Sequence, residues 1–332
     1  MTLKKPFSKD ILHIENIEKL TKGLCERLVE DVFRKYKRRG AVIGISGGID
    51  SSVTMALAVK AFGANRVYGV MMPEKDSSPD SKNLAQVLAD KFGVEAVVEN
   101  IRPALEGLRC YERRDEAIQR VFPDFNPKTD KSKIGVNQTG LDQNLPPVFH
   151  LTVIDSKNIV RSKILPVNEY LQIVAASNFK QRTRMEMVYY HAEQKHYVVL
   201  GTANKHEIDQ GFFVKFGDGG SDMYPLAGLY KTQVYQLAAH LGVPQEIINR
   251  TPTTDTYSAE QTQEEFFYQL PFDVMDLMWY GMENGYSPVE VADVMGKSEG
   301  EVKSIFKNFE RKIKTTDYLR ANPMMYPGFE SF

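Results

Sequence analysis

The stretch Ala41–Ser52 reads AVIGISGGIDSS and decides the fold. Its first five residues form a short apolar run, which predicts a buried β-strand. Glycines and serines follow, and residues 52–62 then predict a helix. Gly47 and Gly48 lack a β-carbon, so the backbone can turn sharply there and approach a phosphate closely. The free N–H groups at the start of the helix favour an anion at the same place.

Asp50 is the unusual residue of this loop, because it places a carboxylate among Ser46, Ser51 and Ser52, whose hydroxyls can donate to an anion. A plain glycine turn with a capping serine explains the glycines but not this acid. A magnesium ion that bridges Asp50 to phosphates explains both. The loop therefore predicts a magnesium-assisted phosphate site at the end of a strand.

Strands and helices alternate outward from the loop. The pattern predicts strands at 67–72, 95–101 and 197–200, and helices at 17–36, 81–92 and 182–194. Such alternation indicates an α/β fold with a doubly wound parallel sheet. The last third is mostly helical, so we expect one domain over residues 1–332 with a helical C-terminal region at about 264–332.

One segment breaks this rhythm, since about 103–166 is rich in Pro, Asn, Asp and Lys and shows no sustained periodicity. A structureless segment of that length is typical of a lid, an oligomer arm or a mobile insertion. We expect an insertion here, partly ordered, that a protease cuts first between residues 111 and 147.

Composition excludes several classes of protein. The 332 residues carry 42 Lys and Arg against 43 Asp and Glu, a net charge of -1, which argues against a general nucleic-acid binder. No apolar run approaches the ~20 residues of a membrane span. Two cysteines are too few for a disulfide framework and fit a reducing compartment, so we expect a cytoplasmic protein without a membrane segment.

The loop sequence resembles the signature of the ATP pyrophosphatase (PP-loop) superfamily, whose members cleave ATP to AMP and pyrophosphate. The resemblance implies ATP contacts from Gly44, Ile45, Ser46, Gly47, Gly48, Ile49, Asp50 and Ser51. The signature alone does not separate the ligases and thiolases that share it.

Later motifs resemble those of NAD synthetases. They are NFKQRTRM (178–185), GTANKHE (201–207), FFVKFGDGGSD (212–222) and PLAGLYK (225–231), followed by PTTD (252–255) and EQTQEE (260–265). The resemblance covers residues 17–101 and 178–313 and leaves the insertion outside. It implies an adenine nucleotide hydrolase-like PP-loop fold.

The resemblance also implies roles for single residues. Asp50 and Glu207 would hold Mg²⁺, while Thr202, Lys231 and Thr253 would contact ATP, and the catalytic residues would be Asp50, Lys231 and Thr253. Deamido-NAD would be bound by Arg182, Lys215 and Asp222. Taken singly, each of these residues is more often a helix cap or a surface ion pair; their joint occurrence favours the site.

The implied reaction is an amidation in two steps. ATP adenylylates the nicotinate carboxylate of deamido-NAD with release of pyrophosphate, and ammonia then displaces AMP to give NAD. About 45 residues precede the loop, too few for a glutaminase domain, so we expect free ammonia, or ammonia from a separate chain, as nitrogen source. Relatives form homodimers with the dinucleotide site between subunits, which implies a homodimer here.

Two other hypotheses stay open at this point. A PP-loop amide ligase could adenylylate a different carboxylate, such as a sugar acid or a secondary-metabolite precursor. Residues 287–306 also read like a helix-turn-helix, although the stretch is poor in Arg and such a pattern is common in packed helices.

Where relatives carry a basic His-Lys pair for the acceptor, this chain has Tyr318 and Leu319, and we expect Arg320 to supply the charge instead.

Overall fold

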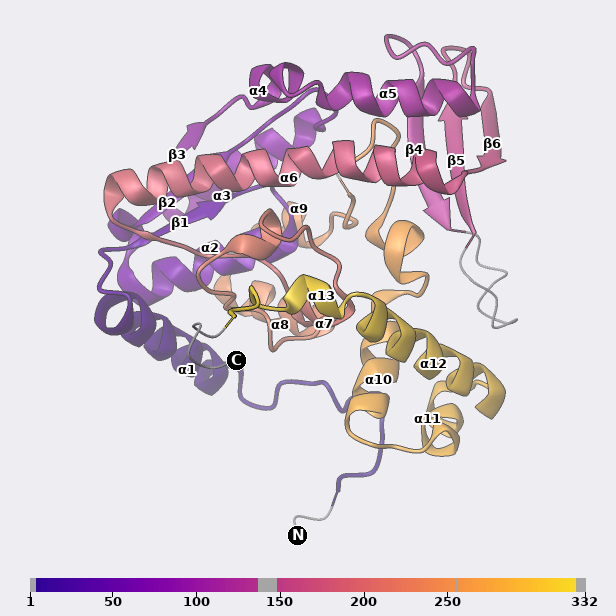
Figure 1. Cartoon of the computed structure of the whole chain (residues 1–332). Helices are drawn as coiled ribbons and strands as arrows, with labels where there is room; N and C mark the ends of the chain where they lie inside the picture. The colour runs from indigo at the N-terminus through magenta and orange to yellow at the C-terminus, as the bar shows by residue number, and fades with distance from the viewer. Residues whose placement is uncertain (1–3, 137–147, 255, 327–332) are drawn as a thin grey trace.

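The computed structural model describes residues 4–136, 148–254 and 256–326. At its centre lies a parallel sheet with the strand order β3-β2-β1-β7 (Figure 1). These strands are β1 (Ala41–Gly44), β2 (Val67–Met71), β3 (Glu95–Val98) and β7 (Val198–Val199). The chain runs from β1 to one edge of the sheet and returns on the other side of β1, which makes the end of β1 a topological switch point. Ligands of open α/β sheets bind at such a point.

Helices cover both faces of this sheet, because its strands are apolar on both sides. Ala41 and Ile43 pack in one core cluster with residues of α1, α2 and α8, while Val42 packs in another with Val188 of α6. The bounds are α1 (Ile17–Val29), α2 (Ile49–Phe62), η2 (Ala64–Arg66), α3 (Pro79–Phe92), α6 (Val167–Lys195) and α8 (Lys231–Leu241). The predicted α/β class with a parallel sheet is therefore confirmed.

The first helix differs from its prediction only in its last turns. Asn16 caps α1 by accepting a hydrogen bond from the Lys19 N–H at 2.8 Å. The helical pattern predicted through residue 36 is then continued by a π-helical segment, η1 (Glu30–Lys35).

The expectation of a structureless segment at 103–166 is wrong for its described part. It holds α4 (Arg102–Gly107), α5 (Cys110–Val121) and an antiparallel sheet of β4 (Lys131–Val136), β5 (Phe149–Ile154) and β6 (Val160–Ile164). The sheet buries only its inner residues, such as Ile134, Leu151 and Val153, against α5 and α6. Charged residues between these positions concealed the alternation. Of the range 111–147 in which a protease is predicted to cut first, residues 111–136 hold most of α5 and all of β4, and residues 137–147 lie outside the described residues.

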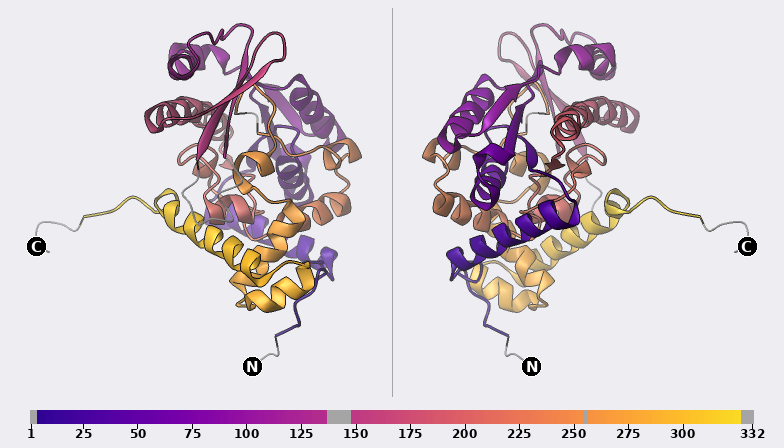
Figure 2. Two further views of the ribbon diagram at one scale, coloured as in Figure 1. Left: turned by 90° about the vertical axis from the view of Figure 1, so that its right-hand side faces the viewer. Right: turned by 90° about the vertical axis from the view of Figure 1, so that its left-hand side faces the viewer.

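Three helices near the C-terminus, α10 (Phe272–Glu283), α11 (Pro288–Met295) and α12 (Glu299–Thr315), pack as a layer at the end opposite β4–β6 (Figure 2). The other elements after β7, besides α8, are α7 (Lys205–Gln210), η4 (Asp218–Gly220), α9 (Gln245–Ile248), η5 (Glu264–Tyr268) and α13 (Asp317–Arg320). Val291 of α11 and Val302, Ile305 and Phe309 of α12 are buried against α10. The apolar positions of the helix-turn-helix pattern thus serve the core of this layer.

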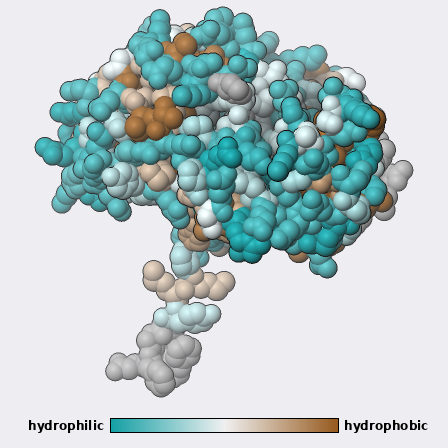
Figure 3. Space-filling view, turned by 90° about the horizontal axis from the view of Figure 1, so that it is seen from above, coloured by the Kyte–Doolittle hydropathy of each residue, from teal (hydrophilic) through white to brown (hydrophobic). Residues whose placement is uncertain are grey.

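The surface seen from above is largely hydrophilic and carries its apolar residues in separate small patches (Figure 3). None of the helices in the described part of the chain combines the length and the apolar character that a membrane span requires.

Candidate active site

The loop after β1 forms the turn that its glycines predict. Gly47 has φ +70°, and a β-carbon there would lie 2.7 Å from Leu84 Cβ and 2.8 Å from the Ser81 carbonyl oxygen. Any other L-residue would therefore be strained and would also clash with α3. Gly48 is the N-cap of α2 and makes no side-chain capping bond, so the first N–H groups of this 14-residue helix stay available to a ligand.

A cavity of about 750 Å³ opens at this helix end. Most of the predicted site residues line it, namely Gly44, Ile45, Ser46, Gly48, Ile49, Asp50, Ser51, Arg182, Thr202, Glu207, Lys215 and Thr253. Segments far apart in the sequence thus meet at the switch point of the sheet. Gly47, Lys231 and Asp222 do not line the cavity. Ser52 does not line it either, since it is fully buried and its hydroxyl donates to the Gly48 carbonyl at 2.8 Å.

Asp50 lies in a compact polar cluster at the wall of the cavity. One of its oxygens accepts from Lys231 Nζ at 2.5 Å and the other from Asn204 Nδ2 at 3.1 Å. Lys231 is fully buried at the first position of α8. Its amine therefore neutralises Asp50 from behind the cavity instead of projecting into the cavity, and a direct contact with a phosphate would require the ion pair to open.

Glu207 is held beside this pair by a capping box. Its carboxylate accepts from the Asn204 N–H at 2.9 Å, while its own N–H donates to Asn204 Oδ1 at 3.3 Å. Burial, together with the nearby Asp50 carboxylate, raises the pKa of Glu207 to about 8. Ionising both carboxylates beside a single amine is therefore unfavourable, and an added cation would offset that cost.

The donor set fits Mg²⁺. Magnesium in nucleotide sites is held by one or two carboxylates and completed by phosphate oxygens and water, which is what Asp50 and Glu207 would provide. Among the described residues, no cluster of three or more His, Cys, Asp or Glu side chains forms a cage made of protein groups alone. The arrangement therefore suits an ion that arrives with a nucleotide.

At the part of the cavity where Tyr318, Leu319 and Lys215 lie, which we call its acceptor side, Arg320 does not take the place that was expected for it. Tyr318 and Leu319 line the cavity, and Lys215 Nζ holds this segment by donating to the carbonyls of Tyr318 and Ala321, each at 2.8 Å. The guanidinium of Arg320 instead donates to the carbonyls of Ile208, Asp209 and Ile313, at the C-terminal ends of α7 and α12. Arg320 does not line the cavity and helix carbonyls occupy its donors, so its role in supplying the acceptor charge stays a prediction that these contacts do not support.

Asp222 also has internal partners. Its oxygens accept from the Tyr189 hydroxyl at 3.0 Å and from the Val199 N–H at 2.7 Å, which fixes the segment after η4 to β7. A role of Asp222 in dinucleotide binding stays a prediction that this single chain does not test.

Sequence reasoning missed Asp218, which lines the cavity. Its carboxylate accepts from the Val214 N–H at 2.8 Å, and burial raises its pKa to about 6. The signal was present, since the acid lies between glycines in the motif at 212–222. Of the two acids in this motif, the resemblance gave a role to Asp222 alone.

The two cysteines are unpaired and take no part in the cavity. Cys110 is buried and its thiol donates to the Ala176 carbonyl at 3.2 Å, and burial raises its pKa to about 11. Burial also raises the pKa of Cys25. Neither thiol has the activated environment of a nucleophile.

Comparison with known proteins narrows this α/β class to one family. The family model described as NAD synthase matches residues 21–127 and 137–323. The NH3-dependent NAD+ synthetase of Rhizobium meliloti is 47% identical over 98% of this chain and 96% of the relative. The chain belongs to the NAD synthase family, as its motifs predicted. Because the match includes 103–127 and 137–166, the expectation that this segment lies outside the resemblance is wrong.

Solved structures agree on the fold. The NH3-dependent NAD synthetase of Campylobacter jejuni superposes with a TM-score of 0.62 at 18% identity, covering 95% of this chain and 100% of that one. The NMN synthetase of Francisella tularensis gives a TM-score of 0.59 at 23% identity with the same coverage. At these identities the likeness supports the architecture alone.

Proposed function

We propose that the chain carries NH3-dependent NAD+ synthetase activity, in which ATP, deamido-NAD and ammonia give NAD, AMP and pyrophosphate. The observation that carries this proposal is the placement of the glycine turn and the α2 N-terminus beside Asp50 and Glu207, in a chain of this family. The N–H groups at the start of α2, together with a cation held by the two carboxylates, would bind a nucleotide's phosphates and offset the charge of departing pyrophosphate.

The chain's own residues would act mainly by positioning. The N–H groups at residues 48–51 would hold phosphate oxygens, and Thr202 and Thr253, which line the cavity, would contact ATP. Arg182 and Lys215 present cations to the acceptor side. Lys231 fixes the Asp50 carboxylate, so that it faces the phosphates in one orientation.

Mg²⁺ is proposed as the cofactor, with Asp50 and Glu207 as its protein ligands. When bound, the ion would neutralise phosphate charge and make the pyrophosphate a better leaving group.

The test is an assay with ATP, Mg²⁺, ammonium and deamido-NAD, in which NAD, AMP and pyrophosphate are measured together. We expect the three products in equal amounts and no NAD when glutamine replaces ammonium. A parallel arm offers nicotinate mononucleotide as acceptor, because Tyr318 and Leu319 add no charge to the cavity wall. Turnover of that acceptor without turnover of deamido-NAD would favour the ligase for a different carboxylate.

A homodimer in the cytoplasm completes the proposal. The dimer rests on the family resemblance, and light scattering of the purified chain tests it by giving twice the mass of 37.7 kDa. The unpaired cysteines fit a reducing compartment.

A further inference from the structure

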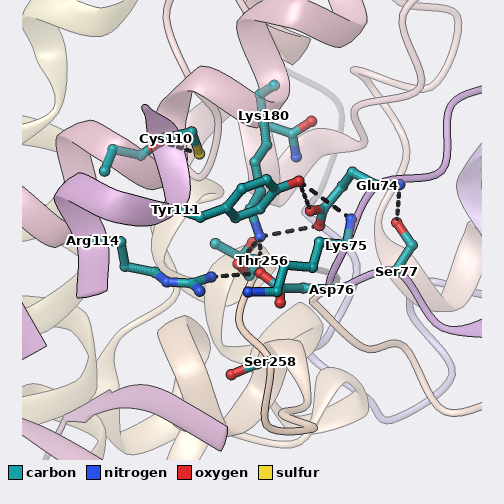
Figure 4. A network of polar contacts seen from close by, with 12 residues as sticks. Glu74, Lys75, Asp76, Ser77, Cys110, Tyr111, Arg114, Lys180, Thr256 and Ser258 are labelled. Carbon is teal, nitrogen blue, oxygen red and sulfur yellow. Dashed lines mark hydrogen bonds and ion pairs between the residues drawn. The ribbon is translucent and has the colours of Figure 1, made fainter. Parts of the chain in front are cut away.

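A group of charged side chains is buried close to Ser77 and Thr256, two residues that line the cavity (Figure 4). We name it the charged hub, and it consists of Glu74, Asp76, Arg114 and Lys180. Lys180 Nζ lies 3.0 Å from Glu74 Oε1 and 2.7 Å from Asp76 Oδ2, and Arg114 Nη1 lies 2.5 Å from the same Asp76 oxygen. The four side chains are at most 4% exposed.

The hub joins three segments of the chain. Glu74 and Asp76 come from the connection between β2 and α3, Lys180 from the middle of α6, and Arg114 from α5 in the region 103–166. Lys180 also donates to the carbonyl of Thr256 at 2.8 Å. Burial alone would raise the pKa of Asp76, but the two cations together hold it below its ordinary value.

Thr256 belongs to the segment that carries Thr253. We name residues 252–254 and 256–265 the threonine loop. Within it, Thr253 pairs with Thr262 in an antiparallel bridge, and the Thr254 N–H donates to the Gln261 carbonyl at 2.9 Å. Thr253, Thr254 and Thr256 all line the cavity, so the position of this loop sets one wall of the site.

The far side of the threonine loop is fastened to β4. The Ala259 N–H donates to the Ser132 carbonyl at 3.1 Å, and Gln261 Nε2 donates to the Ile134 carbonyl at 2.8 Å. Gln261 is 2% exposed and faces Thr254 across the loop. The loop is therefore held at two places. Lys180 of α6 holds it at Thr256 and is linked through Asp76 to Arg114 of α5, and β4 holds it at residues 259–261.

Stability alone does not account for so many buried charges. Desolvation of buried ion pairs costs about as much as their attraction returns, and apolar side chains of similar volume often do as well. Such pairs do provide a fixed geometry, because a hydrogen bond forms only over a narrow range of distances and angles. Here the geometry that is fixed is that of a backbone carbonyl in the wall of the cavity.

We propose that α5 and β4 form a brace that holds the threonine loop in its ATP-binding position, with Lys180, Arg114 and Gln261 as positioning residues. The proposal rests on the proposed use of ATP, and it gives the region 103–166 a role in substrate binding. The hub acts on ATP through the loop, so its loss affects KM for ATP more than KM for deamido-NAD.

The test compares Arg114→Met with Arg120→Met, two variants of α5. Arg114 is part of the hub, whereas Arg120 pairs with Glu169 on the surface and is 47% exposed. Gln261→Leu removes the side-chain bond of the β4 anchor without stranding a charge, and stays informative should Arg114→Met fail to fold. We expect KM for ATP to rise about 10-fold to 100-fold in Arg114→Met and Gln261→Leu, the value of one strong buried hydrogen bond. Arg120→Met should match the wild type.

Hydrogen exchange of the free variants gives a second measurement that does not need activity. Exchange should become faster in residues 256–265 of both variants and stay unchanged in α2. An unchanged KM for ATP together with unchanged exchange in Gln261→Leu would overturn the brace. If activity toward ATP and deamido-NAD fell equally and hydrogen exchange became faster throughout the chain, the hub would contribute only to overall stability, and the brace would also be overturned. A wild type that makes no NAD, with exchange still faster in the loop, would instead remove the proposed function.

Discussion

Replacing Lys231 with Met removes the cation that faces Asp50 and Glu207. The amine is fully buried and lies 2.5 Å from Asp50 Oδ2, and Asp50 and Glu207 both hold the pKa of Lys231 above its ordinary value although burial opposes them. Two carboxylates would be left together without a counter-charge. Removing one partner of a buried pair costs about 3–5 kcal/mol.

The expected loss is somewhat smaller here. The Asp50 side chain is 14% exposed to the cavity, so water can solvate part of the stranded charge. We therefore expect the free energy of unfolding to fall by about 2–4 kcal/mol in Lys231→Met. Asp50→Asn should lose less, about 1–3 kcal/mol, since Glu207 still faces the amine. The double variant leaves only Glu207, whose raised pKa of about 8 lets it stay protonated, and should return to within about 1 kcal/mol of the wild type.

Denaturant unfolding of the four proteins measures this double-mutant cycle, and pyrophosphate release measures the consequence for catalysis. All three variants should lose pyrophosphate release, because the double variant regains stability but not the carboxylate that is proposed to hold Mg²⁺. The exposed control Lys303→Met should change stability by less than about 0.5 kcal/mol. Additive losses in the double variant, or near-normal turnover in Asp50→Asn, would refute the reasoning.

Three further outcomes follow from single groups. Arg320→Ala should lower the free energy of unfolding by about 1–3 kcal/mol through loss of its bonds to helix carbonyls, with KM for deamido-NAD unchanged; a selective rise of that KM would restore Arg320 to the site. Asp218, whose pKa is raised from 3.8 to about 6, disfavours ionisation in the folded state, so its contribution to stability falls as the pH rises from about 4 to about 6. Asp218→Asn should therefore match the wild type in stability at pH 4 and exceed it at pH 7, and urea unfolding at the two pH values would contradict this if the order were reversed. Cys110, with a pKa of about 11, should resist a thiol reagent at pH 8 until the chain unfolds, whereas the partly exposed Cys25 should react first; rapid labelling of Cys110 in the native chain would disprove its burial.

Sequence predicted the centre of the fold because its signals are local. The run Ala41–Ile45, the glycines and the following helix are adjacent in the chain, and the strands and helices found there agree with the prediction within a few residues. The loop's phosphate-binding geometry follows from the same few residues. Asp50 was selected for its chemistry, and the structure places it at the cavity wall.

Prediction is weakest where partners are distant in sequence. Arg320 reaches carbonyls more than 100 residues away at Ile208 and Asp209, and no local pattern shows that these groups occupy its guanidinium. The region 103–166 failed for a related reason, since its strands bury one face only against α5 and α6. A charged helix and half-buried strands look aperiodic until their packing partners are known.

The charged hub combines a residue that the sequence motif marks with contacts that the sequence does not show. Lys180 lies within the motif at 178–185, so the sequence marks it, but its role depends on residues 104 and 76 positions away, at Asp76 and Thr256. Arg114 then connects it to the region that seemed to be an insertion. The role of Lys180, which lies in a family motif, thus depends on α5, which lies outside that motif. The reason is that the threonine loop needs contacts on the side that faces away from the cavity to keep its position. In this chain we propose that α5 and β4 supply these contacts, and KM for ATP and the hydrogen exchange of residues 256–265 measure whether the position of the loop depends on them.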